Sequence, residues 1–130
     1  MQRLKTRAQF QAVLAGATVA RTTHFALHRC ALDAPAGDAA PLFGVAPDVW
    51  VGAMVPKRWA RRAVTRNAIK RQIYTVSALA EASFPQAAHV VRLRAGFDRK
   101  QFVSATSDKL KAAVRAELEQ LLQRARAARP

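Results

Sequence analysis

The feature that most constrains how this chain can fold is a run of positive charge near its middle, PKRWARRAVTRNAIKR, residues 56–71. The run holds seven lysines and arginines in sixteen positions and no acid. On a helix, Arg62, Arg66 and Lys70 lie four residues apart and stay on one side. Like charges at that spacing destabilise an isolated helix by about 0.2–0.5 kcal/mol a pair. The run must therefore lie at a surface, where a partner that supplies anions would offset this cost.

The chain as a whole is strongly basic, because 22 lysines and arginines face only 8 acids in 130 residues, a formal net charge of +14. Nucleic acid is the usual partner of such a domain, and guanidinium groups bind phosphate oxygens in pairs. A membrane-surface helix needs a broad apolar face, but the aromatic candidates Trp59 and Tyr74 lie at the ends of the helix. A solvated helix mixes both signs of charge, as residues 109–124 do. The composition thus favours phosphate binding over a membrane helix or a merely soluble basic protein.

The pattern of apolar residues predicts the order helix, strands, helix, strand, helix. Thr6 can cap the first helix, and Gly16 can end it. Gly52 lies inside a strand, where a glycine indicates a bulge or a close backbone approach. We expect strands over residues 24–32, 49–55 and 89–94, a central helix that begins between Arg58 and Arg62, and a final helix capped by Asp98 or Ser107. This order predicts one α+β domain over residues 1–130, with helices on one face of a sheet and the other face free to bind.

The sequence shows no active site made of protein side chains. Cys30 is the only cysteine, which excludes an internal disulfide and a zinc site of several cysteines. His24 and His28 would lie about 13 Å apart on a strand, too far to share a metal ion. The eight acids are scattered, with no pair set for general acid–base work. No stretch approaches the ~20 apolar residues of a membrane span, so we expect a cytoplasmic protein with no membrane partner.

The stretch VGAMVPKRWARRAVTRNAIKR, residues 51–71, resembles the signature of the protein subunit of bacterial ribonuclease P. In that signature a strand with glycine, a basic turn and the motif Ala-Val-x-Arg-Asn-Arg-x-x-Lys-Arg follow in order. The segments RLKTRAQFQAVL and THFALH look like the N-terminal helix and first strand of the same family. About a dozen matched positions in one ordered block make this resemblance specific.

The resemblance implies a fold and a task. The fold is an α-β sandwich with a left-handed βαβ crossover around the basic helix, which breaks the usual right-handed rule and is shared with a ribosomal protein domain. The protein would bind ribonuclease P RNA through this helix. It would hold the single-stranded 5′ leader of precursor tRNA in a cleft between the first helix and the sheet. The RNA would perform the cleavage with Mg²⁺ that it mainly binds itself, in a 1:1 complex with a monomeric protein.

Carried over by position, the resemblance assigns residues to two RNA-binding surfaces. Those implied to bind the RNA subunit are Lys57, Arg58, Arg62, Arg66, Asn67, Lys70 and Arg71. Those implied to bind the leader are Phe10, Leu14, Phe25, His28 and Arg94. The chain departs from the family pattern at Ala68, where arginine is usual, and at Tyr74 and Thr75, where Arg-Glu is frequent. These departures remove one expected phosphate contact and leave the end of the helix less polar.

Two alternatives stay open. A ribosomal or other structural RNA-binding protein would share the charge and even the fold, but it would not need a cleft lined by Phe10 and Phe25. A protein nuclease would need clustered carboxylates to hold metal ions, which the sequence lacks. Each phenylalanine taken alone is more often a core residue than a stacking platform. The leader cleft is therefore the expectation that depends most on where the fold places these two rings.

Overall fold

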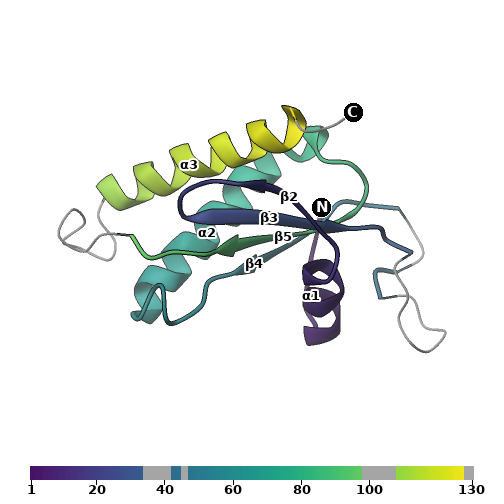
Figure 1. Ribbon diagram of the computed structural model, residues 1–130, viewed down its shortest axis with the longest axis horizontal. Coiled ribbons are helices and arrows are strands. Elements are labelled where there is room, and N and C mark those ends of the chain that lie inside the picture. The colour runs from purple at the N-terminus through teal and green to yellow at the C-terminus, as the bar shows by residue number, and fades with distance from the viewer. Residues whose placement is uncertain (34–41, 45–46, 98–107, 128–130) are drawn as a thin grey trace.

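The computed structural model describes residues 1–33, 42–44, 47–97 and 108–127, and their strands form one five-stranded sheet in the order β1-β4-β5-β3-β2 (Figure 1). The strands are β1 Gln2–Arg3, β2 Ala17–Arg21, β3 Phe25–Cys30, β4 Trp50–Met54 and β5 Ala88–Leu93. The helices are α1 Arg7–Leu14, α2 Ala63–Leu79, the short 3-10 helix η1 Glu81–Ser83 and α3 Asp108–Ala127. This confirms the predicted α+β class. The proposed caps Asp98 and Ser107 lie outside the described residues.

The sheet is mixed. Strands β4 and β5 are parallel neighbours joined through α2, and β1 is parallel to β4, whereas β3 is antiparallel to both β5 and β2. The β4-α2-β5 unit is the βαβ crossover that the resemblance implies, and its hand stays a prediction. The sequence pattern does not predict the edge strands β1 and β2. Strand β1 has only two residues, too few for an alternating pattern.

The two faces of the sheet have separate cores, because successive side chains of a strand point to opposite faces. Helices α2 and α3 cover one face, where Phe25, Leu27 and Leu93 are fully buried (Figure 1). Helix α1 lies on the other face, where Val13 and Val90 belong to a smaller cluster. The expectation that this second face is free is therefore wrong in part. The apolar stripe of α1 needs cover, so the helix packs across β3 and β5.

Helix α1 is held in place at both ends of its first turn. The Thr6 side chain accepts a hydrogen bond from the Gln9 backbone N–H, and the Gln9 side chain accepts one from the Thr6 N–H, so the predicted cap is confirmed as a capping box. Gln9 Nε2 also donates to the Leu42 carbonyl at 2.8 Å. The predicted close approach at Gly52 is confirmed, since an added Cβ would lie 2.7 Å from both Leu4 Cδ1 and Phe10 Cε1. A glycine on β4 thus makes room for the ring of Phe10.

Candidate nucleic-acid interface

Helix α2 presents the basic run to solvent because its apolar residues fall on the opposite side. Ile69, Ile73 and Val76 are buried against the sheet and α3. Six of the seven residues assigned to the RNA subunit are exposed, namely Lys57, Arg58, Arg62, Asn67, Lys70 and Arg71. Within the described part of the chain, no ion pair joins any of them to a carboxylate. The helix and the turn before it therefore form a cationic surface that nothing in the described protein neutralises.

Arg66, the seventh residue, has a structural task as well. It is half-buried, and its Nη1 donates to the carbonyls of Ala60 at 3.1 Å and Arg61 at 2.8 Å. These bonds tie the turn between β4 and α2 to the first turns of the helix. The N-cap residue, Arg62, makes no side-chain capping bond, so Arg66 fixes a helix start that lacks an ordinary cap. No pattern in the sequence indicates this second task.

The turn also carries an aromatic ring at the surface. Trp59 is 37% exposed, and the guanidinium carbon of Arg58 lies 5.3 Å from its ring centroid. That distance is within the range of a cation–π contact. The backbone N–H groups of Trp59 and Ala60 both donate to the Pro56 carbonyl, at 3.1 and 3.2 Å. The start of the basic surface is therefore a closed turn with an exposed tryptophan beside its cations.

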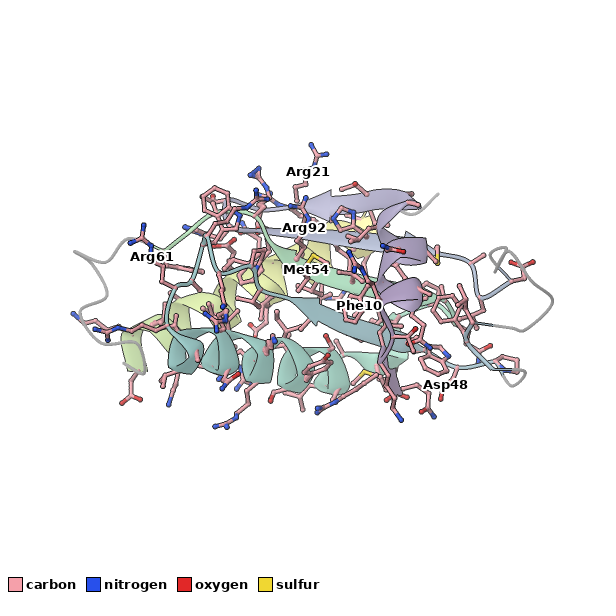
Figure 2. The ribbon with its side chains drawn as sticks, turned by 90° about the horizontal axis from the view of Figure 1, so that it is seen from below. Phe10, Arg21, Asp48, Met54, Arg61 and Arg92 are labelled. Atoms are coloured by element: carbon pink, nitrogen blue, oxygen red, sulfur yellow. The ribbon has the colours of Figure 1, made fainter. Side chains whose placement is uncertain are left out.

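A second surface lies on the face of the sheet that α1 only partly covers, and Figure 2 shows Phe10, Met54 and Arg92 there. Phe10 and Leu14 are half-buried at the α1 side, as the leader assignment requires. His28 projects from β3 toward the same face. Arg92 of β5 was not assigned by sequence, although it shares the strand parity of Val90, which faces α1. We call the part of this face formed by Phe10, Leu14, Met54 and Arg92, with the buried His28 beneath them, the α1-side patch.

His28 and Arg92 form a hydrogen-bonded pair in the α1-side patch. Arg92 Nε donates to His28 Nε2 at 3.1 Å, and His28 Nδ1 lies 3.2 Å from Thr18 Oγ1. Because Nε2 accepts, the proton of the neutral ring is on Nδ1, which donates to the threonine. Burial lowers the pKa of His28, and the positive charges of Arg92 and Arg21 lower it further. His28 is therefore a neutral residue at pH 7 that orients Arg92.

Phe25 and Arg94, which were both assigned to the leader, lie outside the α1-side patch. Phe25 is 0% exposed and lies in the core beneath α2 and α3, on the opposite face from His28, so its assignment to the leader cleft is wrong. Positions 25 and 28 differ by an odd number, and strand alternation therefore sends their side chains to opposite faces. Arg94 lies just after β5, half-buried, and its backbone N–H donates to the His24 carbonyl at 2.7 Å. Its role in leader binding stays a prediction.

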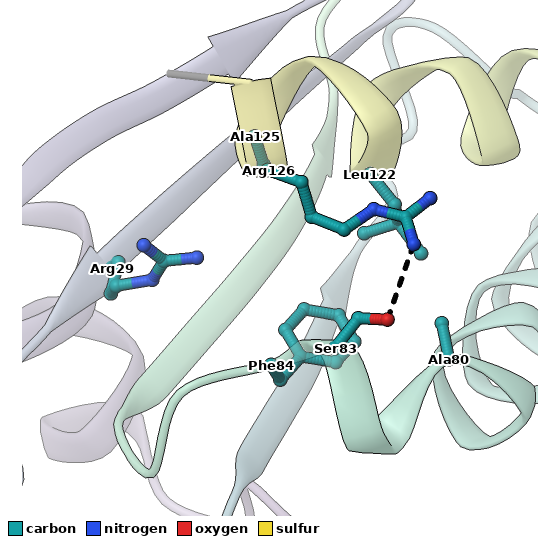
Figure 3. A pocket seen from close by; sticks show the side chains of 7 residues that line it. All are labelled: Arg29, Ala80, Ser83, Phe84, Leu122, Ala125 and Arg126. Carbon is teal, nitrogen blue, oxygen red and sulfur yellow. Dashed lines mark hydrogen bonds between the residues drawn. The ribbon is translucent and has the colours of Figure 1, made fainter. Parts of the chain in front are cut away.

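A small pocket lies apart from both surfaces, between the end of α2, η1, β3 and the last turns of α3 (Figure 3). Arg29, Ser83, Phe84 and Arg126 are among its lining residues, and Arg126 Nη1 donates to Ser83 Oγ at 3.2 Å. Its closed part has room for about one water-sized group.

Among the described residues, no group of three or more His, Cys, Asp or Glu side chains is placed to hold a metal ion. No described helix is long and apolar enough to cross a membrane.

Comparison with solved structures identifies the class of fold. A structure of the Staphylococcus aureus RNase P protein covers 95% of this chain and 94% of its own, with a TM-score of 0.67 and 19% sequence identity. A second structure of the S. aureus RNase P protein gives a TM-score of 0.63 at 23% identity. At these identities the likeness shows the fold alone, an α+β sandwich of the kind found in RNase P proteins.

Comparison of sequences identifies the family. The family model for Ribonuclease P matches residues 1–126. The Ribonuclease P protein component of Paraburkholderia xenovorans is 34% identical over 105 residues, which are 81% of this chain and 66% of that protein. That of Burkholderia pseudomallei is 38% identical over 78 residues, 60% of this chain and 57% of that protein. The matches thus span less than two thirds of the length of these relatives. The chain belongs to the ribonuclease P protein component family.

Proposed function

We propose that this chain is the protein subunit of a bacterial ribonuclease P. In this role it binds the catalytic RNA and the 5′ leader of precursor tRNA, and so assists the metal-dependent cleavage that forms the 5′ end of tRNA. The observation that carries the proposal is the cationic surface of α2 and its preceding turn, whose six exposed assigned residues have no described acidic partner. Membership of the family supports ribonuclease P RNA as the partner.

The α2 surface suits an RNA of fixed shape. Lysine and arginine side chains bind phosphates without reading sequence, and each phosphate contact releases bound counterions. Affinity therefore falls with salt, with a slope of about 0.7–0.9 per contact on logarithmic axes. The bonds from Arg66 to the carbonyls of Ala60 and Arg61 hold the turn in shape before RNA arrives. This preorganisation lowers the entropic cost of binding.

The α1-side patch suits a single strand. Unpaired bases stack on aromatic rings, and Phe10 offers a half-buried ring beside the sheet. Arg92 uses Nε to bond His28, and its two terminal nitrogens have no partner among the described residues. Those nitrogens can hold a phosphate of the leader while Phe10 contacts a base. Because His28 stays neutral, it directs Arg92 without competing for the phosphate.

The chemical step belongs to the RNA in this proposal. Mg²⁺ is bound mainly by the RNA, and the protein contributes by holding the substrate in position. We further propose a 1:1 complex of a monomeric protein with its RNA, located in the cytoplasm. A structural RNA-binding protein without a role in tRNA cleavage is the alternative, because the α2 surface alone would serve it equally well.

The test is reconstitution at low Mg²⁺. The purified protein is mixed with a bacterial ribonuclease P RNA, and 5′ cleavage of a precursor tRNA is measured, with protein alone and RNA alone as controls. Cleavage that needs both components supports the proposal. Tight RNA binding without any gain in cleavage contradicts it and favours the structural alternative.

A further inference from the structure

The row of cations on α2 does not end where the helix sequence suggests. Arg66 and Lys70 are followed, four residues later on the same side, by Tyr74, a neutral residue one turn or about 6 Å further on. The guanidinium carbon of Arg3 lies 4.0 Å from the centroid of the Tyr74 ring. The guanidinium group of Arg3, which belongs to another segment, thus lies where a cation at position 74 would have continued the row.

The register of β1 places Arg3 there. Gln2 pairs with Trp50 and Arg3 with Val51, so the side chain of Arg3 shares the face of Val51. Leu4, the next residue, is buried in the cluster on the α1 face. Strand alternation therefore directs Arg3 to the α2 side of the sheet edge, and it remains exposed there.

Tyr74 is held as a rigid platform for this cation. Its hydroxyl oxygen accepts a hydrogen bond from the Ala53 backbone N–H at 3.2 Å. Ala53 lies on β4 beyond the two positions that β1 pairs, so this bond occupies a donor at an otherwise open stretch of the edge. The ring is therefore fixed at one end by β4, and a cation over its face is stabilised by the ring quadrupole.

The carboxylates close to the start of β1 do not neutralise Arg3. Asp48 and Glu81 both contact the Met1 amino group, at 3.6 and 3.4 Å, and Asp48 also accepts a bond from Gln2. No ion pair between Arg3 and an acid occurs among the residues that the structure describes. The positive charge of Arg3 is therefore available to an outside anion.

We propose that Arg3, seated on Tyr74, extends the phosphate-binding row of α2 onto the sheet edge and binds a phosphate of the RNA subunit. The RNA-binding surface is then built from two segments that are far apart in the chain. This inference rests on the proposed function, because it deepens the α2 surface described there.

The test compares RNA affinity across matched variants, using a bacterial ribonuclease P RNA at several salt concentrations. Arg3→Ala is expected to weaken binding about tenfold, the effect of one lost charge-assisted contact, and to reduce the salt slope by about 1. The control is Lys111→Ala, which removes an exposed positive charge from α3 and is expected to leave affinity unchanged. Circular dichroism verifies that each variant is folded.

Two further variants separate the cation from its platform. In Arg3→Ala/Tyr74→Arg, a guanidinium returns to the same place in the row, and affinity is expected to recover. Tyr74→Phe keeps the ring but loses the bond to Ala53, so it is expected to lower the urea midpoint and leave RNA affinity unchanged. If Tyr74→Phe lost as much affinity as Arg3→Ala, the hydroxyl bond and not the ring face would position the cation, and the role given to the ring face would be overturned.

The outcomes for the proposed function and for this inference differ. If the wild-type protein binds the RNA and Arg3→Ala binds as well as Lys111→Ala, the inference is wrong and the proposed function stands. If the wild-type protein does not bind the RNA, the proposed function fails and the inference fails with it. Loss in Arg3→Ala with recovery in the double variant supports both.

Discussion

Glu117 of α3 connects the last helix to the turn between β2 and β3, and its removal provides a quantitative test of the fold. Its Oε2 accepts hydrogen bonds from the Thr22 hydroxyl and the His24 backbone N–H, both at 2.6 Å. Its Oε1 lies 2.7 Å from His24 Nδ1. The His24 ring in turn stacks on Phe97 with centroids 3.9 Å apart. One carboxylate thus orders a backbone turn, a hydroxyl and a stacked ring.

Glu117→Ala is expected to cost about 3 kcal/mol in the free energy of unfolding. A donor left without its partner costs about 1–3 kcal/mol, and the substitution deprives three donors at once. The Glu117 side chain is 14% exposed, so water reaches part of the vacated space and keeps the loss near the lower end of the sum. Glu117→Gln keeps one acceptor oxygen and is expected to cost about 1 kcal/mol.

The effect of Glu117 depends on pH in a defined direction. Burial by itself raises the pKa of Glu117, but the hydrogen bonds from Thr22 and His24 outweigh it and hold the pKa below its ordinary value. A carboxyl group with a lowered pKa in the folded state stabilises the protein above its unfolded pKa, about 4.3, and that contribution is lost as pH falls through the folded value. The gap between wild type and Glu117→Ala is therefore largest near neutral pH and shrinks in acid.

The assay is urea denaturation at neutral and acid pH, with Glu119→Ala as the matched control. Glu119 lies on the same helix, but it is 62% exposed and pairs with Arg115 only at the surface. Its removal is expected to cost under about 1 kcal/mol. Equal losses in the two variants would refute the role of Glu117, and so would a Glu117→Ala deficit that does not change with pH.

Four other substitutions probe the two surfaces. Gly52→Ala is expected to lower the free energy of unfolding by about 1–2 kcal/mol and to displace Phe10, because the added Cβ would lie 2.7 Å from that ring; urea denaturation that shows no loss would contradict this packing. Phe10→Ala is expected to weaken binding of precursor tRNA more than of mature tRNA in reconstituted enzyme, and equal losses would rule out the leader contact. Arg66→Ala and Lys70→Ala are both expected to weaken RNA binding, but only Arg66→Ala should also destabilise the free protein, by about 1–3 kcal/mol, because it alone bonds the turn carbonyls; equal urea midpoints would contradict that second task.

Local patterns in the sequence were sufficient for the principal helices and strands. The cap at Thr6 and the solvent-facing cations of α2 depend on neighbours within a few residues, where sequence spacing and spatial distance agree. The glycine at position 52 indicates a close approach, but only the fold shows that Leu4 and Phe10 are the residues that approach it. The family signature around residues 51–71 is likewise a continuous stretch. These features were predicted and are confirmed.

Tertiary structure decided which residues meet across the sheet. Strand alternation alone directs the side chains of Phe25 and His28 to opposite faces of the sheet. Only the packing of α2 and α3 shows that the Phe25 side lies in the larger core. Arg3 reaches Tyr74 because β1 adds to the edge of β4, and a strand of two residues has no sequence pattern. The spacing of apolar residues and the capping of helices involve residues that are close in sequence. The pairing of distant strands and side chains depends on how whole elements pack, and no local spacing encodes it.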